Sequence, residues 1–207
     1  RYLGDEIDIH AGGEDLIFPH HENEIAQSEA ANKKPFAKYW MHNAFLNINN
    51  KKMSKSLGNF FTVRDISEKY DLQILRFFML SAHYRSPLNF SEELMESAKN
   101  GLERIITAVD NLSRTAKGAA AEKISEEEKE KLSKIKEYAD KFEAAMDDDF
   151  NTANAIAVLF EITRDINTLL QNESVSAAVL QTLLGFYDEL LGLFGFLPSE
   201  QSSDGAA

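Results

Sequence analysis

Cysteine is absent from this 207-residue chain, as are a signal peptide and any uninterrupted apolar run of about eighteen residues. Without cysteine, the chain can form neither disulfides nor metal sites from its own thiolates. Without a leader or an apolar span, we expect a cytoplasmic protein with no membrane partner. Hydrophobic residues make up 43% of the sequence, enough for one large core or two small ones.

An initiator methionine is also lacking. The chain begins at Arg1, and the run that follows contains Ile7 and Ile9 in strand-like alternation with no preceding turn or cap. This start indicates a piece excised from a longer protein.

Positive charge is scarce in the second half of the chain. The net charge is −12, from 22 basic and 34 acidic residues. Residues 1–90 hold 11 of each sign, whereas residues 91–207 hold 11 basic and 23 acidic ones. Nucleic-acid-binding domains are usually basic because phosphate neutralisation supplies most of their affinity. Broad nucleic-acid binding by the second half is therefore disfavoured, while contacts from a few Lys or Arg on one face stay open.

The first part of the chain has the order strand, helix, strand. Residues 5–11 are typical of a strand that enters a tight turn at Gly12–Gly13. A helix is predicted over about 19–31 and a second strand over 39–48. This order fits one unit of a parallel, Rossmann-like α/β sheet whose remaining strands would lie upstream of Arg1.

The rest of the chain is predicted to be helical. Thr62 with Asp65, and then Asp71, have the pattern of helix caps. Apolar residues then follow helical spacing at 94, 98, 102, 105, 109 and 112, and in the last helix at 175, 179, 183, 186, 190 and 193. Another capping box is predicted at Ser125–Glu128, and a helix N-terminus after Asn151. Four such helices with short connections predict an antiparallel bundle.

We therefore expect a mainly α fold in four parts. A remnant of a Rossmann-like α/β domain occupies residues 1–48, and a polar loop with a connecting helical segment occupies 49–90. The helical bundle spans 91–197, and residues 198–207 form a disordered tail.

His20 and Glu24 are candidate metal ligands. If a helix starts at Pro19, which suits a first helical position, these two side chains lie four residues apart on one face. His21 then points about 100° away from them. An imidazole and a carboxylate can share a zinc ion, but the same spacing is also common on a solvated polar face near a helix N-terminus.

The clearest chemical signal is Lys52-Met-Ser-Lys-Ser56. Lys52 and Lys55 can reach phosphates as compact point charges, while Ser54 and Ser56 add hydroxyl donors. Gly58 gives the loop freedom to close. Such a loop could stabilise charge on a departing pyrophosphate, although a solvated basic hairpin has a similar composition.

Several ordered segments resemble cysteinyl-tRNA synthetases, a family of class I aminoacyl-tRNA synthetases. Lys52–Ser56 is the full KMSKS signature of class I enzymes. The other segments similar to the family are Asp8–Ser28, Tyr39–His42, Gly58–Asp65 and Ala145–Thr152. The resemblance runs from about Asp5 to about Leu170.

The resemblance implies an enzyme that joins L-cysteine to ATP, releases pyrophosphate, and transfers the cysteinyl group to tRNA(Cys). Lys55 and Lys52 would be catalytic, and ATP, taken with Mg, would be bound by a set made of Gly12, Gly13, Asp15, Ser54, Lys55 and Ser56. The family's zinc ion is held by two Cys, one His and one Glu, of which His20 and Glu24 match the last two. Other histidines match positions near that site: His10, His21 and His42. Arginines that match the tRNA-facing helical part, or that simply pair with surface carboxylates, are Arg76, Arg85 and Arg104.

The family's HIGH motif, its zinc-ligand cysteines and its anticodon-reading domain are missing from this sequence. We therefore expect an internal fragment, monomeric and inactive alone, that holds zinc weakly or not at all. Two alternatives stay open: a cysteine-activating paralogue that transfers to an amino sugar, and a non-enzymatic helical module that binds tRNA.

Overall fold

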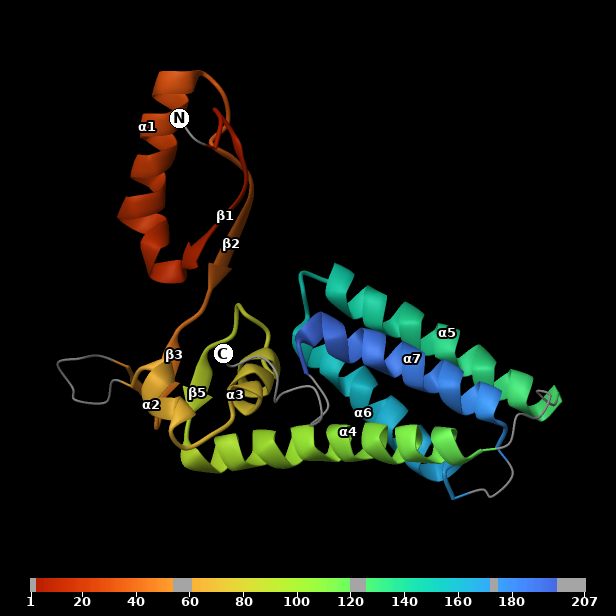
Figure 1. Cartoon of the computed structure of the whole chain (residues 1–207). Helices are drawn as coiled ribbons and strands as arrows, with labels where there is room; N and C mark the ends of the chain where they lie inside the picture. The colour runs from red at the N-terminus through yellow and green to blue at the C-terminus, as the bar shows by residue number, and fades with distance from the viewer. Residues whose placement is uncertain (1–2, 54–60, 120–125, 172–174, 197–207) are drawn as a thin grey trace. The chain divides into compact units, whose positions relative to one another are not determined.

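The computed structural model describes residues 3–53, 61–119, 126–171 and 175–196, which divide into two compact units (Figure 1). Arg1–Phe60 and His83–Ser91 make up the first unit. Phe61–Ala82 and Glu92–Ala207 make up the second. The chain thus leaves the first unit once and returns to it before the long helices begin.

The first unit contains the expected strand, helix and parallel strand. Strand β1 (Ile7–Gly13) pairs in parallel with β2 (Ala37–Asn43), and helix α1 (Glu22–Asn32) connects them. This confirms the unit of a parallel α/β sheet that the sequence predicts. Gly12 and Gly13 belong to the end of β1 rather than to a turn.

The helix starts later than predicted. A 3-10 turn (Glu14–Leu16) and a wider turn (Ile17–His21) precede α1, and Phe18 inside the wider turn has an extended backbone with φ −128° and ψ 132°. A residue before proline is pushed out of the helical region by the proline ring, and Phe18 precedes Pro19. The regular helix therefore begins at Glu22, and His20 lies in the turn before it.

The predicted second strand is in fact two strands. β2 ends at Asn43 and β3 (Leu46–Ile48) follows as the centre of a separate sheet, between β4 (Lys51–Lys52) and β5 (Leu88–Phe90). The β3–β4 hairpin turns at Asn49 and Asn50, whose φ angles are +48° and +61°. Two left-handed residues match a type I′ turn, which asparagine tolerates better than most residues.

Two short, capped helices open the second unit. Before α2 (Val63–Ser67), Thr62 Oγ1 accepts from Asp65 N while Asp65 Oδ2 accepts from Thr62 N, which is a complete capping box. Before α3 (Leu72–Leu80), Asp71 Oδ1 accepts from the backbone N–H of Gln73. Both predicted caps are confirmed.

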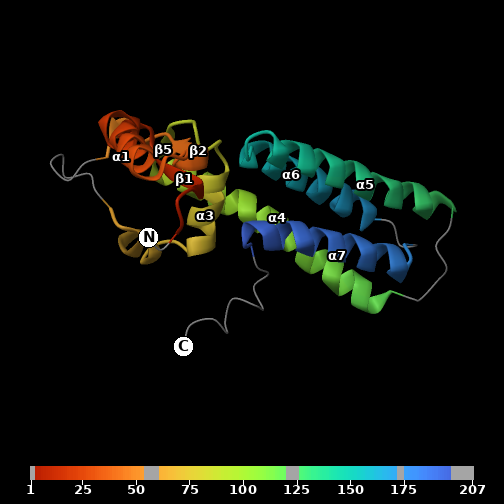
Figure 2. The same ribbon diagram turned by 90° about the horizontal axis from the view of Figure 1, so that it is seen from above.

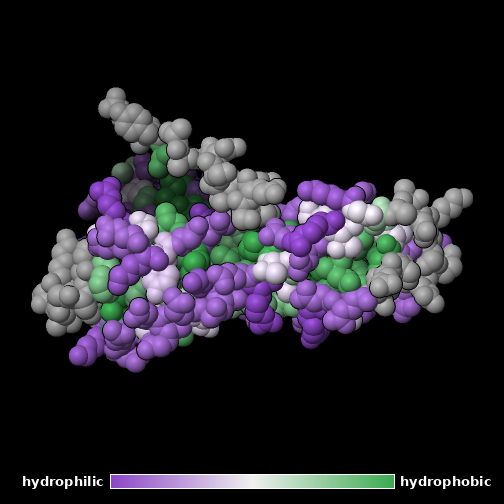
Figure 3. Space-filling view, turned by 60° about the horizontal axis from the view of Figure 1, so that its bottom comes forward, coloured by the Kyte–Doolittle hydropathy of each residue, from purple (hydrophilic) through white to green (hydrophobic). Residues whose placement is uncertain are grey.

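Four long helices form the bundle of the second unit, and Figures 1 and 2 both show them side by side. They are α4 (Glu92–Gly118), α5 (Glu126–Asp147), α6 (Thr152–Leu169) and α7 (Ala177–Phe194). Asn151 caps α6 by accepting from Asn154 N, and Gly195 ends α7 in the left-handed conformation. Much of the face in Figure 3 is hydrophilic with hydrophobic side chains between, as amphipathic helices require.

The buried face of the bundle differs from the predicted stripes at their ends. At the start of α4 Met95 is fully buried, whereas Leu94 is 43% exposed. In α7 Leu193 is 69% exposed, whereas Tyr187 is fully buried and donates its hydroxyl to the carbonyl oxygen of Leu159 at 2.9 Å. A step of one residue turns the side chain by about 100°, so spacings of three and four leave the exact face open.

A buried carboxylate joins two helices of the bundle. Glu128 of α5 is 6% exposed, and its Oε1 accepts a 2.7 Å hydrogen bond from the backbone N–H of Ser176, which precedes α7. The predicted capping box pairs Glu128 with Ser125, but Ser125 lies outside the described residues. That capping box stays a prediction. In the structure Glu128 accepts at the N-terminus of α7, where a negative charge is favourable.

Helix α7 is also long and apolar enough to match a membrane span by length and composition. Of that stretch, 44% is buried within the structure. Its residues pack against α4 and α5, and a helix in the core of a bundle has the same composition.

The exposure difference between Met95 and Leu94 can be tested by mutation. Met95→Ala should lower the free energy of unfolding by about 2–5 kcal/mol, because it leaves a cavity in a filled core. Leu94→Ala, the matched control on the same helix, should change it by about 1 kcal/mol or less. Urea unfolding followed by circular dichroism measures both, and equal losses would contradict the face assigned to α4.

Candidate functional site

The candidate site lies on one face of the β1–β2 pair. The register places His10 opposite Trp40 and Gly12 opposite His42. Because side chains alternate along a strand, these four positions share a face, while Ile9 and its partner Tyr39 lie on the other and are exposed. The turn before α1 and its first turn bring further polar groups to the first face.

His10 is held by contacts on two sides. Its Nε2 lies 2.7 Å from Oε2 of Glu24 on α1, and its ring stacks on Trp40 with centroids 4.6 Å apart. Its second ring nitrogen, Nδ1, is buried and has no hydrogen-bond partner among the described residues. His10 therefore has a fixed orientation and one unsatisfied nitrogen.

His21 is the buried histidine of the site. It is 5% exposed, and its Nδ1 shares a 2.9 Å hydrogen bond with Nε2 of His42. The rings of His10 and His21 meet edge to face, with centroids 4.6 Å apart. Burial lowers the pKa of His42 below its ordinary value, and the nearby charges of His21, His10 and Arg85 lower it further.

Gly12 makes this packing possible. A Cβ at Gly12 would lie 2.9 Å from Cε1 and 3.0 Å from Nε2 of His21, closer than real Cβ contacts. The absence of a side chain in β1 is thus what lets the His21 imidazole reach the sheet.

The described group of potential metal ligands contains one of the two predicted metal ligands. Glu24 lies in the cluster with His10, but His20 is exposed in the turn before α1. The side chain that groups with His10 and Glu24 is His21, with ligand atoms of all three within 4.8 Å of one another. The assignment of His20 as a ligand stays a prediction that rests on the resemblance.

The predicted ATP-binding residues fall in two places. Gly12 and Gly13 end β1, and Asp15 is exposed in the turn that follows, where its Oδ1 lies 2.5 Å from the position of a Cβ on Gly13. A side chain at Gly13 would displace that carboxylate. Ser54, Lys55 and Ser56 lie outside the described residues.

The signature loop starts from a well-defined hairpin. Lys51 and Lys52 form β4, paired with Ile48 and Asn47 of β3, and the backbone N–H of Asn50 donates to Asn89 Oδ1 at 2.6 Å. The backbone at Lys52, the first residue of the signature, is therefore fixed to an edge strand of a three-stranded sheet.

Sequence reasoning missed the part played by Trp40. Its ring stacks on His10, lies 5.4 Å from the centroid of His21, and is nearly parallel to His42. The alternation of Trp40 and His42 along one strand was the available signal, since residues two apart share a face.

The arginines considered for tRNA contact have partners within the chain. Arg76 Nη1 donates to the carbonyl oxygen of Phe194 at 3.4 Å, and Arg104 lies over the Phe160 ring. Arg85 Nε donates to the hydroxyl of Tyr84 at 3.1 Å. These contacts favour a structural role at each of the three positions.

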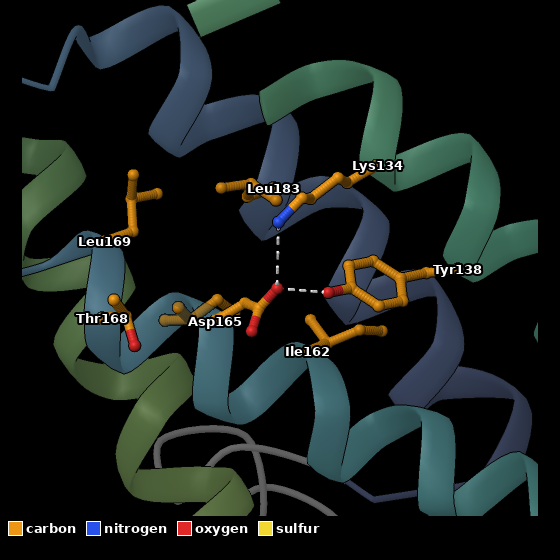
Figure 4. A pocket seen from close by; sticks show the side chains of 8 residues that line it. Lys134, Tyr138, Ile162, Asp165, Thr168, Leu169 and Leu183 are labelled. Carbon is orange, nitrogen blue, oxygen red and sulfur yellow. Dashed lines mark hydrogen bonds and ion pairs between the residues drawn. The ribbon is translucent and has the colours of Figure 1, made fainter. Parts of the chain in front are cut away.

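A hollow with a volume of about 220 Å³ lies in the helical bundle (Figure 4). Its polar end holds Asp165, whose Oδ2 accepts from the Tyr138 hydroxyl at 2.5 Å and lies 3.7 Å from Lys134 Nζ. Its walls are apolar, formed by residues such as Ile162 and Leu183. Its Oδ1 also lies 3.5 Å from Arg164 Nε, so Asp165 already has three partners and the hollow offers a ligand little unsatisfied polar surface.

Two family profiles match the chain in order. "tRNA synthetases class I (C) catalytic domain" matches residues 1–100, and "DALR domain" matches residues 141–198. The first match contains the histidine cluster and the signature loop, and the second lies within the bundle.

Curated relatives match nearly the whole chain. It is 63% identical over 195 residues to a cysteine--tRNA ligase of Lachnospira eligens, covering 94% of this chain and 41% of that protein. It is 54% identical over 201 residues to the cysteine--tRNA ligase of Bacillus licheniformis, covering 97% and 43%. The chain thus spans about two-fifths of the length of these relatives.

A solved structure is similar in fold at lower identity. It is the crystal structure of the ternary complex of Agrobacterium radiobacter K84 agnB2 LeuRS-tRNA-LeuAMS. The match has a TM-score of 0.76 at 19% identity and covers 97% of this chain and 27% of that one. It shows that the fold is shared with a class of longer chains.

The role of Gly12 can be tested by adding one methyl group. Gly12→Ala should push the His21 ring away from the sheet, break its hydrogen bond to His42, and destabilise the first unit by about 1–3 kcal/mol. The imidazole resonances of both histidines, followed by NMR, should shift. The matched control is Gly185→Ala, where a Cβ meets nothing within 4 Å. Unchanged resonances in Gly12→Ala would show that the ring does not need this space.

Proposed function

We propose that this chain belongs to the class I cysteinyl-tRNA synthetases and supplies the phosphate-handling loop and the helical domain of an enzyme that activates cysteine with ATP and charges tRNA(Cys). The relatives named cysteine--tRNA ligase, at 54% and 63% identity over nearly the whole chain, support this proposal. Since those relatives are more than twice as long, the activity belongs to a longer assembly of which this stretch is one part.

The observation that carries the proposal is the order of two matches in one chain. A class I catalytic profile ends at residue 100 and a DALR profile begins at residue 141, with Lys52–Ser56 inside the first. The hairpin β3–β4 supports the proposed role of the loop, because it anchors the backbone at Lys52, where the signature begins.

In the proposed first step the carboxylate of cysteine attacks the α-phosphorus of ATP. A carboxyl oxygen–phosphorus bond forms, and the bond to the bridging oxygen breaks as pyrophosphate leaves. Negative charge grows on the departing group, which Lys55 and Lys52 would stabilise, with hydroxyl donors from Ser54 and Ser56. ATP would enter as its magnesium complex, as is usual for nucleotide triphosphates.

Gly12, Gly13 and Asp15 would lie near the adenosine ribose. The exposed Asp15 carboxylate can accept from ribose hydroxyls. Gly12 and Gly13 support this arrangement through the space they leave for the His21 ring and for the Asp15 carboxylate.

The family's zinc ion is a separate matter for this chain. A centre of two Cys, one His and one Glu cannot be filled from its residues, because the sequence contains no cysteine. His20 is exposed and is not a member of the described group that contains Glu24. The residues present do not fit the four-ligand centre, so no catalytic step is assigned to zinc here.

In the second step a terminal ribose hydroxyl of tRNA would attack the cysteinyl carbonyl, and AMP would leave. The DALR match favours tRNA as the acceptor over an amino sugar, because it lies in the helical part that a sugar acceptor would not need. The 23 acidic residues after residue 90 speak against tight tRNA binding by that part alone. We place the enzyme in the cytoplasm and expect it to act as a monomer.

A chimera tests the proposal directly. Residues 1–207 would replace the corresponding stretch of the Bacillus licheniformis cysteine--tRNA ligase, and the product would be assayed for cysteine-dependent exchange of pyrophosphate into ATP. Activity is expected, and Lys55→Ala in the chimera should lower the exchange rate by about 10²–10³, as for loss of one transition-state donor.

Lys51→Ala is the matched control, because Lys51 is exposed on β4 one residue before the signature. It should keep the exchange rate of the chimera. A folded chimera that transfers cysteine to an amino sugar but not to tRNA would overturn the proposed acceptor. Equal rates for Lys55→Ala and Lys51→Ala would remove Lys55 from the mechanism.

A further inference from the structure

We propose that the hollow between α5, α6 and α7 binds a neutral aromatic molecule of one or two fused rings. Helix α5 contributes Lys134 and Tyr138, α6 contributes a face that runs from Ile162 to Leu169, and α7 contributes Leu183 (Figure 4). The described lining residues all belong to the second unit. The site is therefore independent of the activity proposed above.

The floor of the hollow is apolar and its rim is polar. Ile162 and Ile166, which form the floor, are each 1% exposed. At the rim the side chain of Lys134 is 57% exposed and that of Asp165 is 33% exposed. An apolar recess with a few polar groups at one end is the usual form of a small-molecule site.

The size of the hollow indicates a small ring system. Its volume is about 220 Å³. An engineered cavity of about 150 Å³ with aliphatic walls binds benzene, so this hollow has room for one or two fused rings. Protein interiors leave few voids larger than a water molecule, because unfilled space forfeits dispersion contacts with the side chains around it. An apolar ligand would restore those contacts.

The charges of the lining favour a neutral ligand over an ion. Among the described lining residues Lys134 and Asp165 are charged, with opposite signs, and Nζ lies 3.7 Å from Oδ2. The Tyr138 hydroxyl donates to the same Oδ2. Burial raises the pKa of Tyr138 and Asp165 raises it further, so this hydroxyl keeps its proton. An ion would lose its water here without gaining an unpaired opposite charge.

Tyr138 gives the hollow an aromatic wall. Its side chain is 8% exposed, its hydroxyl bond to Asp165 limits rotation of the ring, and Lys141 Nζ lies 5.7 Å from the ring centroid. Aromatic rings attract one another in edge-to-face and offset arrangements, and a ring that is already ordered loses little entropy when a ligand packs on it. This wall favours an aromatic ligand over an aliphatic one of equal size.

The test is a titration of the purified 207-residue chain with indole, followed by methyl NMR. Indole should bind saturably and one-to-one, and it should shift the methyl resonances of Ile162, Ile166 and Leu183. The methyl groups of Ile9, in the other unit, should not shift. Two charged analogues, tryptamine and indole-3-acetate, should bind about tenfold more weakly or worse, because each would bury a charge without a partner.

A larger side chain should close the site. Leu183→Phe should weaken indole binding by about tenfold or more, because indole would have to overpack the space that the new ring fills. Leu193→Phe is the matched control, since it makes the same change on the same helix at a side chain that is 69% exposed. It should leave the affinity unchanged. Urea unfolding checks that both variants fold.

Lys134→Met tests the charge balance, and it carries the test if Leu183→Phe does not fold. Because Asp165 then loses its lysine partner, the preference should move from indole toward the cation tryptamine. Lys136→Met, at an exposed lysine of the same helix that does not line the hollow, should keep the original preference. Absence of saturable binding up to the solubility of indole would overturn the proposal, as would tighter binding of tryptamine than of indole by the unaltered chain. An unchanged affinity in a folded Leu183→Phe variant would place the indole elsewhere and overturn it too.

Discussion

The parallel pairing of β1 with β2 is the constraint on which the candidate site depends. It sets His10 opposite Trp40 and Gly12 opposite His42, and the alternation of the strands turns all four toward the polypeptide that connects them. A slip of one residue would send them to the opposite face. Gly12 then leaves the space into which His21 fits. Register and one absent side chain together create a histidine cluster from segments up to 32 residues apart.

The helical bundle is stabilised by a different kind of interaction. Its helices are held by burial of apolar faces, and the few buried polar groups are satisfied inside it, as when Tyr187 bonds to Leu159 or Glu128 to Ser176. None of these contacts reaches the histidine cluster, which belongs to the other unit. The proposed enzyme thus combines a small region of reactive side chains with a large region that gives shape and contact surface.

Most helices of the fold and their caps could be predicted from the sequence, because capping residues and apolar periodicity are strong local signals. The box at Thr62 and Asp65 and the cap at Asn151 depend on residues a few positions apart, and both are as predicted. The exact helix face could not be predicted, since it is decided by packing between distant helices. For the same reason Leu193, predicted to be buried in its stripe, is exposed.

The site itself could be predicted only in part. The spacing of His20 and Glu24 assumed a helix from Pro19, but the proline holds the residue before it out of the helix, and the regular helix starts three residues later. That shift changes which histidine approaches Glu24. A spacing of four residues places two side chains on one face only if the helix is continuous, and the spacing itself does not show where the helix is interrupted. The family resemblance supplied roles for these residues, but their positions come from tertiary contacts.

The packing of the histidine cluster can be measured by an NMR titration of the chain's imidazoles. The ordinary pKa of histidine is about 6.5, and burial together with neighbouring charges lowers that of His42. As the pH falls, His42 should therefore gain its proton only below the ordinary pKa of histidine. If His42 instead titrates at or above that ordinary pKa, the cluster is not packed as described.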